Sequence, residues 1–156
     1  MPDQPDHWLL ATDVAQQATR RYRGWPPVLT CAFSRENPGD AKLFVAHLGR
    51  APVAGLLVLR HGGGASYHIG HTRSAGRMTS AHCLLLWQAI LWLKKKQTSY
   101  FELGFVDTEE GADLARFKLG IGANVRPLGG TWLWWPPLTK LLRPIGIMDH
   151  RLMHPS

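Results

Sequence analysis

The segment from Ala81 to Lys96 constrains the fold most, because its middle is apolar on nearly every face. Thr79 or Ser80 is a suitable N-cap for a helix that begins at Ala81. The lysines at the end of the segment complement the negative end of a helix dipole. An apolar helix of this kind is buried on several sides. We therefore expect it to pack against a sheet and a second helix.

A strand is predicted on each side of this helix, at residues 65–70 and 99–106. The polar, cationic segment 71–78 reads as a loop that joins the first strand to the helix. The whole unit is long enough for a right-handed crossover. A cationic loop at a helix N-terminus can bind an anion. If the protein does chemistry, we expect it near this loop and near Lys118.

The N-terminal half predicts an antiparallel meander. Residues 42–48, 53–60 and 65–70 read as three strands whose joining loops are too short for a crossover. A helix is predicted over residues 8–24, where apolar side chains recur at helical spacing. Residues 28–34 are apolar enough for either a strand or a helical turn, and the sequence leaves both open.

The C-terminal part predicts an acidic loop at 107–111, a short helix at 112–119 and a final strand at 124–135. The tail at 138–156 is expected to wrap the surface. The chain of 156 residues fits one domain, 1–156. The element order predicts an α/β fold of the mixed α+β type, with a mostly antiparallel sheet and helices on both faces.

Charge and cysteine content restrict the possible partners. The net charge is +7, from 18 Lys+Arg against 11 Asp+Glu. This balance favours an anionic partner such as a nucleic acid, a nucleotide-linked substrate or an anionic membrane surface, and a basic but inert surface stays open. Cys31 and Cys83 lie far apart without CxxC spacing, so we expect two reduced core thiols and neither a disulfide nor a metal site.

Features of secretion and membrane insertion are not recognisable in the sequence. The N-terminus lacks the basic and apolar regions of a signal peptide. No apolar run approaches the roughly 18 residues that a membrane span needs. We therefore expect a soluble, cytoplasmic protein without a transmembrane segment.

The order of elements resembles that of the GNAT acyltransferase fold, and in detail its FemAB-type branch. The most specific part is Phe117-Lys118-Leu119-Gly120-Ile121-Gly122 after Tyr100-Phe101-Glu102-Leu103-Gly104, which resembles the signature YDxG…FKxGFG. Three further pieces are similar to the paired strands, the aromatic strand and the central helix of that family: residues 44–46 with 52–55, residues 65–70, and residues 85–90. The resemblance spans about residues 42–135.

The resemblance implies amide formation, in which an amine attacks an acyl group carried by an aminoacyl-tRNA or an acyl-CoA. It implies no tightly bound cofactor. Such a reaction needs positioning, a donor for the developing oxyanion and a proton acceptor. Lys118 matches the family's lysine and would supply positive charge to the acyl carbonyl or to a terminal phosphate. Glu102 stands where the family more often has Asp, and Tyr67 would be either a hydrogen-bond donor or a packing ring.

The segment from Arg73 to Met78 partly matches the pyrophosphate loop of acyl-CoA enzymes, R-x-x-G-x-G/A, with Met78 where a small residue is needed. Its two arginines could instead bind a phosphate of tRNA or of a nucleotide-linked acceptor. His68 or His71 could accept a proton near neutral pH. The expected substrate-binding residues are Arg73, Arg77, Ser80, Phe117, His71, Asp107 (for an attacking ammonium group) and Trp134 (as an exposed lid or stacking surface).

Two alternatives remain beside an acyl- or aminoacyl-transferase. One is an N-acetyltransferase that uses acetyl-CoA. The other is a non-catalytic GNAT-like domain that binds RNA or a protein through its basic surface and exposed tryptophans. FemAB-type transferases usually contain two such domains, and this chain has room for one. Three alternatives therefore stay open: a minimal enzyme, an enzyme with a smaller acceptor, and a half that pairs as a homodimer or with a second GNAT-like chain.

Overall fold

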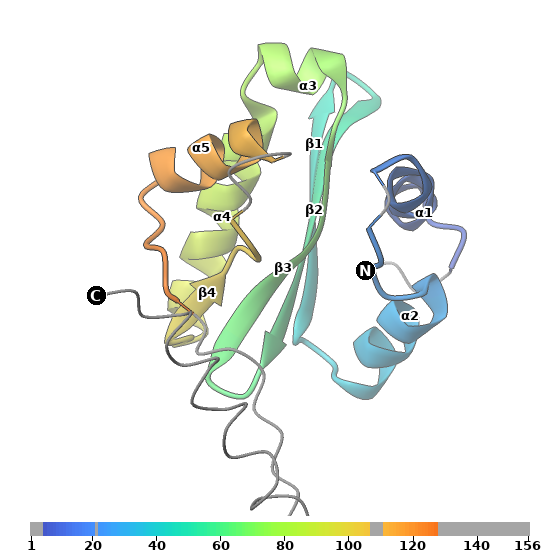
Figure 1. The fold of residues 1–156 in the computed structure, drawn as a ribbon. Helices are drawn as coiled ribbons and strands as arrows, with labels where there is room; N and C mark the ends of the chain where they lie inside the picture. Colours follow the sequence, from blue (N-terminus) through green and yellow to red (C-terminus); the bar gives the residue numbers. More distant parts are fainter. Residues whose placement is uncertain (1–4, 21, 107–110, 128–156) are drawn as a thin grey trace, which may run out of the picture. The chain divides into compact units, whose positions relative to one another are not determined.

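The computed structural model describes residues 5–20, 22–106 and 111–127. The contacts divide the chain into two units, Met1–Ala123 and Asn124–Ser156. Every helix and strand of the described residues lies in the first unit (Figure 1). The helices are α1 (Trp8–Arg20), α2 (Pro27–Glu36), α3 (Ser74–Met78), α4 (Ala81–Lys95) and α5 (Ala112–Gly120), and the strands are β1 (Ala41–Leu48), β2 (Ala51–His61), β3 (Gly64–Thr72) and β4 (Tyr100–Glu102).

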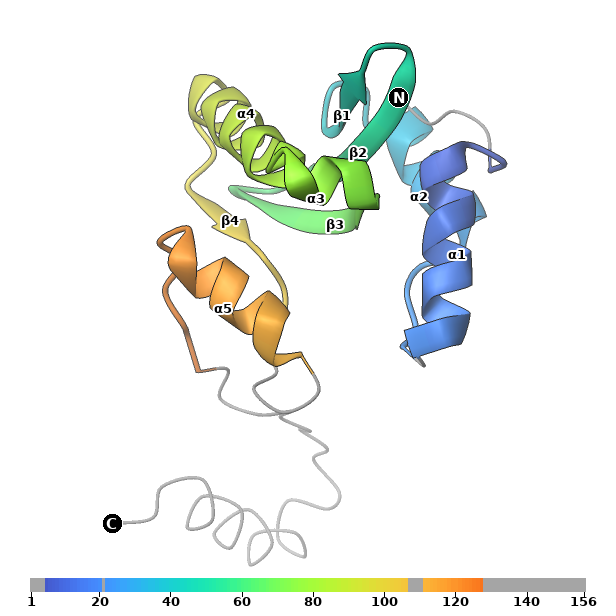
Figure 2. The ribbon, with the colours of Figure 1, turned by 90° about the horizontal axis from the view of Figure 1, so that it is seen from above.

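The four strands form one sheet in the order β1-β2-β3-β4. The first two pairings are antiparallel, and β3 pairs with β4 in parallel after the crossover through α4. Helices α1 and α2 cover one face of the sheet, and α4 and α5 lie on the other (Figures 1 and 2). The predicted fold class is therefore confirmed, including the meander, the crossover and the two helical layers.

Each face of the sheet has its own apolar core. The core on the α4 side is built from β2, β3 and α4: Val53, Ala54, Leu56, Val58, Ala65, Ala81, Leu85, Leu86, Ala89 and Leu93. The core on the α1–α2 side joins both helices to the sheet: Leu9, Leu10, Cys31, Ala41, Leu57, Leu59 and Ile69. Strand β2 contributes to both, which explains why its apolar run does not alternate with polar residues.

A register shift in β3 decides which of its side chains face which core. Leu57 pairs with Ile69, and the next residue, Val58, pairs with Tyr67, so His68 is the extra residue of a β-bulge. Val58 and Tyr67 belong to the core under α4, whereas Leu57 and Ile69 belong to the core under α1 and α2. The bulge therefore turns Tyr67 toward α4.

Several element boundaries differ from the prediction. Helix α1 ends at Arg20 rather than at residue 24, and the undecided segment 28–34 is helical in α2. Pro27 stands in the first turn of α2, where its missing N–H group costs no hydrogen bond, so this proline favours the start of the helix. Strand β4 has three residues instead of the eight expected at 99–106.

The predicted loop 71–78 was wrong. Strand β3 extends to Thr72, and the one-turn helix α3 follows it. Of the predicted strand 124–135, residues 124–127 are not in a strand, and the remainder lies outside the described residues, as does the predicted surface tail at 138–156.

The outer side of α4 is exposed, contrary to the expected enclosure on several sides. Leu84 and Trp87 are 56% and 58% exposed. Cys83 is exposed as well, so only Cys31 is a core thiol. Within the described part of the chain, no helix is both long and apolar enough to cross a membrane.

Helix α3 is held close to β2 at Gly76. The backbone N–H of Arg73 donates to the Val53 carbonyl at 2.9 Å. A Cβ atom on Gly76 would overlap that same carbonyl oxygen. The glycine at position 76, which is part of the partial match to the acyl-CoA pyrophosphate loop, is therefore explained by its packing against the backbone of β2.

We predict that Gly76→Ala destabilises the fold by about 1–3 kcal/mol, because the new methyl group forces α3 away from β2. Gly120→Ala at the end of α5 is the control, since a Cβ atom there meets nothing within 4 Å. The measurement is the free energy of unfolding in urea. Equal stabilities of the two variants would contradict this account of Gly76.

Candidate functional site

The backbones of β3 and β4 separate after a short ladder. The parallel pairing consists of Gly64 with Tyr100, Ala65 with Phe101, and Ser66 with Glu102. Strand β4 ends there, whereas β3 continues to Thr72. The six further residues of β3 therefore have no β4 partner. Among the described residues, the backbone N–H and C=O groups that point to that edge, other than the Thr72 carbonyl that Arg77 contacts, are available to another hydrogen-bonding group.

Lys118 of α5 fixes the chain just beyond β4. Gly104 has φ of +75°, a conformation that favours glycine. The Nζ atom of Lys118 donates a hydrogen bond to the Phe105 carbonyl at 2.7 Å. Burial lowers the pKa of Lys118. A small cavity of about 10 Å³, room for about one water molecule, lies beside Lys118. Its lining is Tyr67, Leu86, Leu103, Leu114, Phe117 and Lys118.

A hydrogen-bonded chain crosses from β3 to the start of α4 beside this cavity. The Tyr67 hydroxyl lies 2.9 Å from Nε2 of His82, and Nδ1 of His82 lies 3.1 Å from the Thr72 hydroxyl. Burial raises the pKa of Tyr67 and lowers the pKa of His82, and His71 adds to the lowering. Both groups are then neutral at pH 7, so one ring nitrogen of His82 donates to its hydroxyl partner and the other accepts from its partner.

Local sequence places these three side chains. The bulge at His68 turns Tyr67 toward α4, and the Tyr67 ring lies over Gly70, where a Cβ atom would overlap the phenol oxygen. The Phe117 ring lies 5.9 Å from the His82 ring, centroid to centroid, so α5 also packs against His82.

Sequence reasoning missed His82. The signal was present, because His82 precedes the buried residues Leu85 and Leu86 by three and four positions and so lies on the same side of the helix. The histidines that were considered lie elsewhere. His68 contacts Thr30 of α2 at 2.9 Å, and His71 contacts Gln16 of α1 at 2.9 Å.

The two arginines make contacts of their own near the end of β3. The guanidinium of Arg73 lies 5.6 Å from the ring centroid of Trp8 in α1. Arg77 donates from Nη1 to the Thr72 carbonyl at 3.0 Å. Burial lowers the pKa of His71, and Arg73, Arg77 and Arg20 add to the lowering. The arginines therefore form a positively charged region around His71 on the α1 side.

The remaining predicted site residues are dispersed. Glu102 is exposed at the end of β4, and no hydrogen bond or ion pair between described residues joins it to the Tyr67–His82–Thr72 chain. Ser80 stands at the N-cap position of α4, as predicted, but it has φ of +52° and its side chain makes no capping bond. Asp107 and Trp134 lie outside the described residues.

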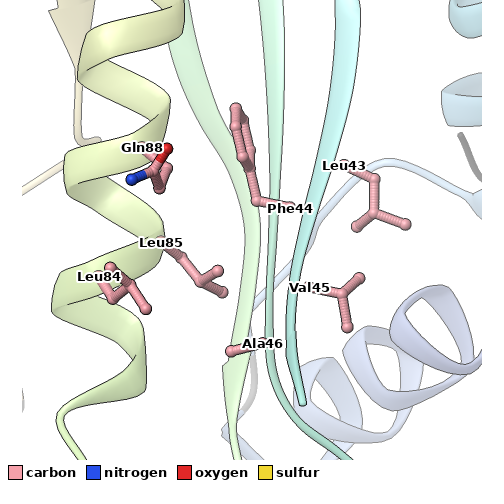
Figure 3. A pocket seen from close by; sticks show the side chains of 7 residues that line it. All are labelled: Leu43, Phe44, Val45, Ala46, Leu84, Leu85 and Gln88. Carbon is pink, nitrogen blue, oxygen red and sulfur yellow. The ribbon is translucent and has the colours of Figure 1, made fainter.

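A larger hollow of about 420 Å³ lies at the β1 edge (Figure 3). Phe44 and Ala46 point toward α4 there, and Leu43 and Val45 point to the opposite face. Its other lining residues are Leu84, Leu85 and Gln88 of α4. None of the seven has an ionisable side chain. The hollow therefore offers little acid–base chemistry, and the smaller cavity beside Lys118 is the better candidate site.

Residues 7–119 match the family model described as "Acetyltransferase (GNAT) domain". The chain belongs to this family. Membership supports an acyltransferase-type function for the GNAT domain. No curated protein matches the chain.

The structure of the tetramutant of BH1408 protein from Bacillus halodurans is similar to this GNAT domain. The alignment has a TM-score of 0.56 and 16% identity, and it covers 81% of this chain and 90% of the other. At that identity the likeness supports the fold alone.

We predict that the GNAT domain loses stability as the pH falls below about 6.5, the ordinary pKa of histidine. Burial lowers the pKa of both His68 and His82 in the folded state. The unfolded chain therefore binds protons at a higher pH than the folded chain. Stability is fully present above the unfolded pKa and is lost as the pH falls through it toward the folded pKa. Urea midpoints at pH 7.5, 6.5 and 5.5 measure the loss.

The variant His68→Gln should lose less stability between pH 7.5 and 5.5 than the wild type. His47→Gln, at an exposed position of β1, is the matched control and should behave like the wild type. A wild-type midpoint that is the same at pH 5.5 as at pH 7.5 would contradict the prediction.

Proposed function

We propose that this GNAT domain transfers an acyl group from an activated thioester or ester to an amine and so forms an amide bond. The observation that supports the proposal best is the separation of β3 from β4 after Ser66 and Glu102, next to the cavity that Lys118 and Tyr67 line. An extended donor with amide groups can pair with the unpaired edge of β3 as a strand would.

Acyl transfer needs a donor group for the carbonyl oxygen as it becomes an oxyanion. The free edge of β3 supplies backbone N–H groups, and Lys118 supplies positive charge at the mouth of the same opening. Preorganised donors of this kind typically contribute about 10²–10³ in rate each. Phe117 and Leu103 add apolar walls to the cavity that would limit water.

We propose an acyl-CoA or an aminoacyl-tRNA as the donor, with no tightly bound cofactor. Within the family, we propose that the chain is most similar to the FemAB-type branch. The positively charged region around His71, made by Arg20, Arg73 and Arg77, supports a donor that bears phosphates. Met78, where an acyl-CoA loop needs a small residue, is 83% exposed at the end of α3. We propose further that the protein acts in the cytoplasm, as a homodimer or with a second GNAT-like chain.

We predict that Lys118→Ala lowers kcat/KM for acyl transfer by about 10²-fold or more, because it removes both the charge and the hydrogen bond to Phe105. Lys118→Gln separates the two effects, since an amide keeps a donor for Phe105 but no charge. Lys94→Ala, at an exposed lysine at the end of α4, is the control. The measurement is product formation from each donor, with circular dichroism to verify folding.

Two binding measurements choose between the donors. A thermal shift with millimolar acetyl-CoA indicates an acyl-CoA enzyme, and a tRNA mobility shift that weakens with salt indicates the tRNA-linked donor. A different outcome would support a non-catalytic RNA-binding domain. In that case the wild type binds tRNA but transfers no acyl group, and Lys118→Ala leaves tRNA binding unchanged.

A further inference from the structure

His82 lies where an apolar residue would be expected. It is the second residue of α4 and precedes Leu85 and Leu86 on the side that packs against the sheet. Both of its ring nitrogens have hydroxyl partners, Tyr67 and Thr72, and both partners come from β3. Burying a polar ring costs free energy that an apolar residue would not, so a structural contact alone does not explain the choice of histidine.

We propose that His82 and Thr72 hold the Tyr67 hydroxyl as the proton acceptor for the attacking amine. This inference rests on the proposed acyl transfer. Tyr67 is then the catalytic residue, because it lines the cavity beside Lys118. His82 and Thr72 are positioning residues that act through Tyr67.

The proton transfer balances within this chain of groups. As the amine nitrogen bonds to the acyl carbon, its proton moves to the Tyr67 oxygen, and the Tyr67 proton moves to Nε2 of His82. When the bond from the acyl carbon to the donor's sulfur or oxygen breaks, the proton returns from the imidazolium through Tyr67 to that leaving atom. After the reaction, Tyr67 and His82 have both returned to their starting protonation states.

The relay needs the tautomer in which His82 donates to Thr72, and the hydroxyl of Thr72 can accept that hydrogen bond. When Nδ1–H of His82 donates to the Thr72 hydroxyl, Nε2 is left with a lone pair for Tyr67. The titratable groups that interact with His82 are Tyr67, through the hydrogen bond, and His71, which adds to the effect of burial. Arg77 donates to the carbonyl of Thr72, and Lys118 lines the cavity together with Tyr67. Burial is the larger cause of the lowered pKa of His82, so the imidazole is neutral and able to accept a proton at pH 7.

The two histidines of β3, His68 and His71, do not have this geometry. The side chains of His68 and His71 contact α2 and α1, on the opposite face of the sheet from α4. Of the three histidines considered, His82 alone contacts both Tyr67 and a second group of β3.

The pH dependence of kcat/KM tests the relay, with the donor and amine for which wild-type transfer is measured. We expect wild type to show an acid limb below pH 6.5 that His82→Gln lacks, together with a drop in rate of about 10²-fold at pH 7. Thr72→Val should lower the rate about tenfold, and Thr72→Ser should restore it. Gly70→Ala should resemble Tyr67→Phe, because the added methyl group displaces the phenol oxygen.

A second measurement does not depend on activity. Nitrogen-15 shifts of the labelled wild-type protein at pH 7.5 should give His82 a protonated Nδ1 and an unprotonated Nε2, and Thr72→Val should mix the two tautomers. A predominantly Nε2-protonated His82 would overturn the relay. So would an unchanged acid limb in an active, folded His82→Gln, and in that case acyl transfer itself would stand. Wild-type protein that transfers no acyl group from either donor would overturn the proposed function instead.

Discussion

The packing of α4 on the sheet is the interaction on which the site depends. The buried residues of α4 recur at spacings of three and four and lie over β2 and β3: Ala81, Leu85, Leu86, Ala89 and Leu93. Burial of one large aliphatic side chain stabilises a fold by roughly 1.5–3 kcal/mol, against about 1 kcal/mol for a typical hydrogen bond. The apolar contact, rather than the hydrogen bonds of His82, therefore fixes the helix. The imidazole is held in place as a consequence, because it lies on the same side one turn earlier.

Strand β3 serves two layers at once, and the bulge at His68 makes this possible. Tyr67 before the bulge and Thr72 after it bond to His82 on the α4 side, whereas His71 bonds to α1 on the other side. Without the extra residue, the strand's alternation would turn either Tyr67 or Ile69 to the wrong face. The same irregularity that places the phenol therefore also completes the core under α1 and α2.

Much of the fold could be predicted from the sequence because it follows from local patterns. The meander, the crossover and the apolar helix are set by turn length and by apolar spacing, and all three are present. The segment 71–78 could not be predicted in this way, since α3 depends on the close approach of Gly76 to Val53, which is distant in sequence. The length of β4 likewise depends on the positive φ of Gly104 and on the contact from Lys118 to Phe105, which is distant in sequence. For the site, the residues chosen from the family resemblance, Lys118, Phe117 and Tyr67, all line one cavity. His82 belongs to no motif, and only its position on the buried side of α4 could have indicated it.

The two halves of the site differ in how firmly they are held. Tyr67, His82 and Thr72 lie on β3 and α4, next to residues of β2 that are almost fully buried. The opposite wall comes from β4 and α5, whose contacts with this core, Phe101, Leu103 and Phe117, are only partly buried. Among the described residues, three residue pairs of the β3–β4 ladder and the hydrogen bond from Lys118 to Phe105 help to hold that wall. Because fewer buried contacts mean a smaller free energy of local opening, the acyl donor would be admitted by movement of β4 and α5 rather than of α4. The hydrogen bonds of Tyr67, His82 and Thr72 would then stay intact while the opening between β3 and β4 widens. A site that binds an extended donor and also positions a proton acceptor requires this.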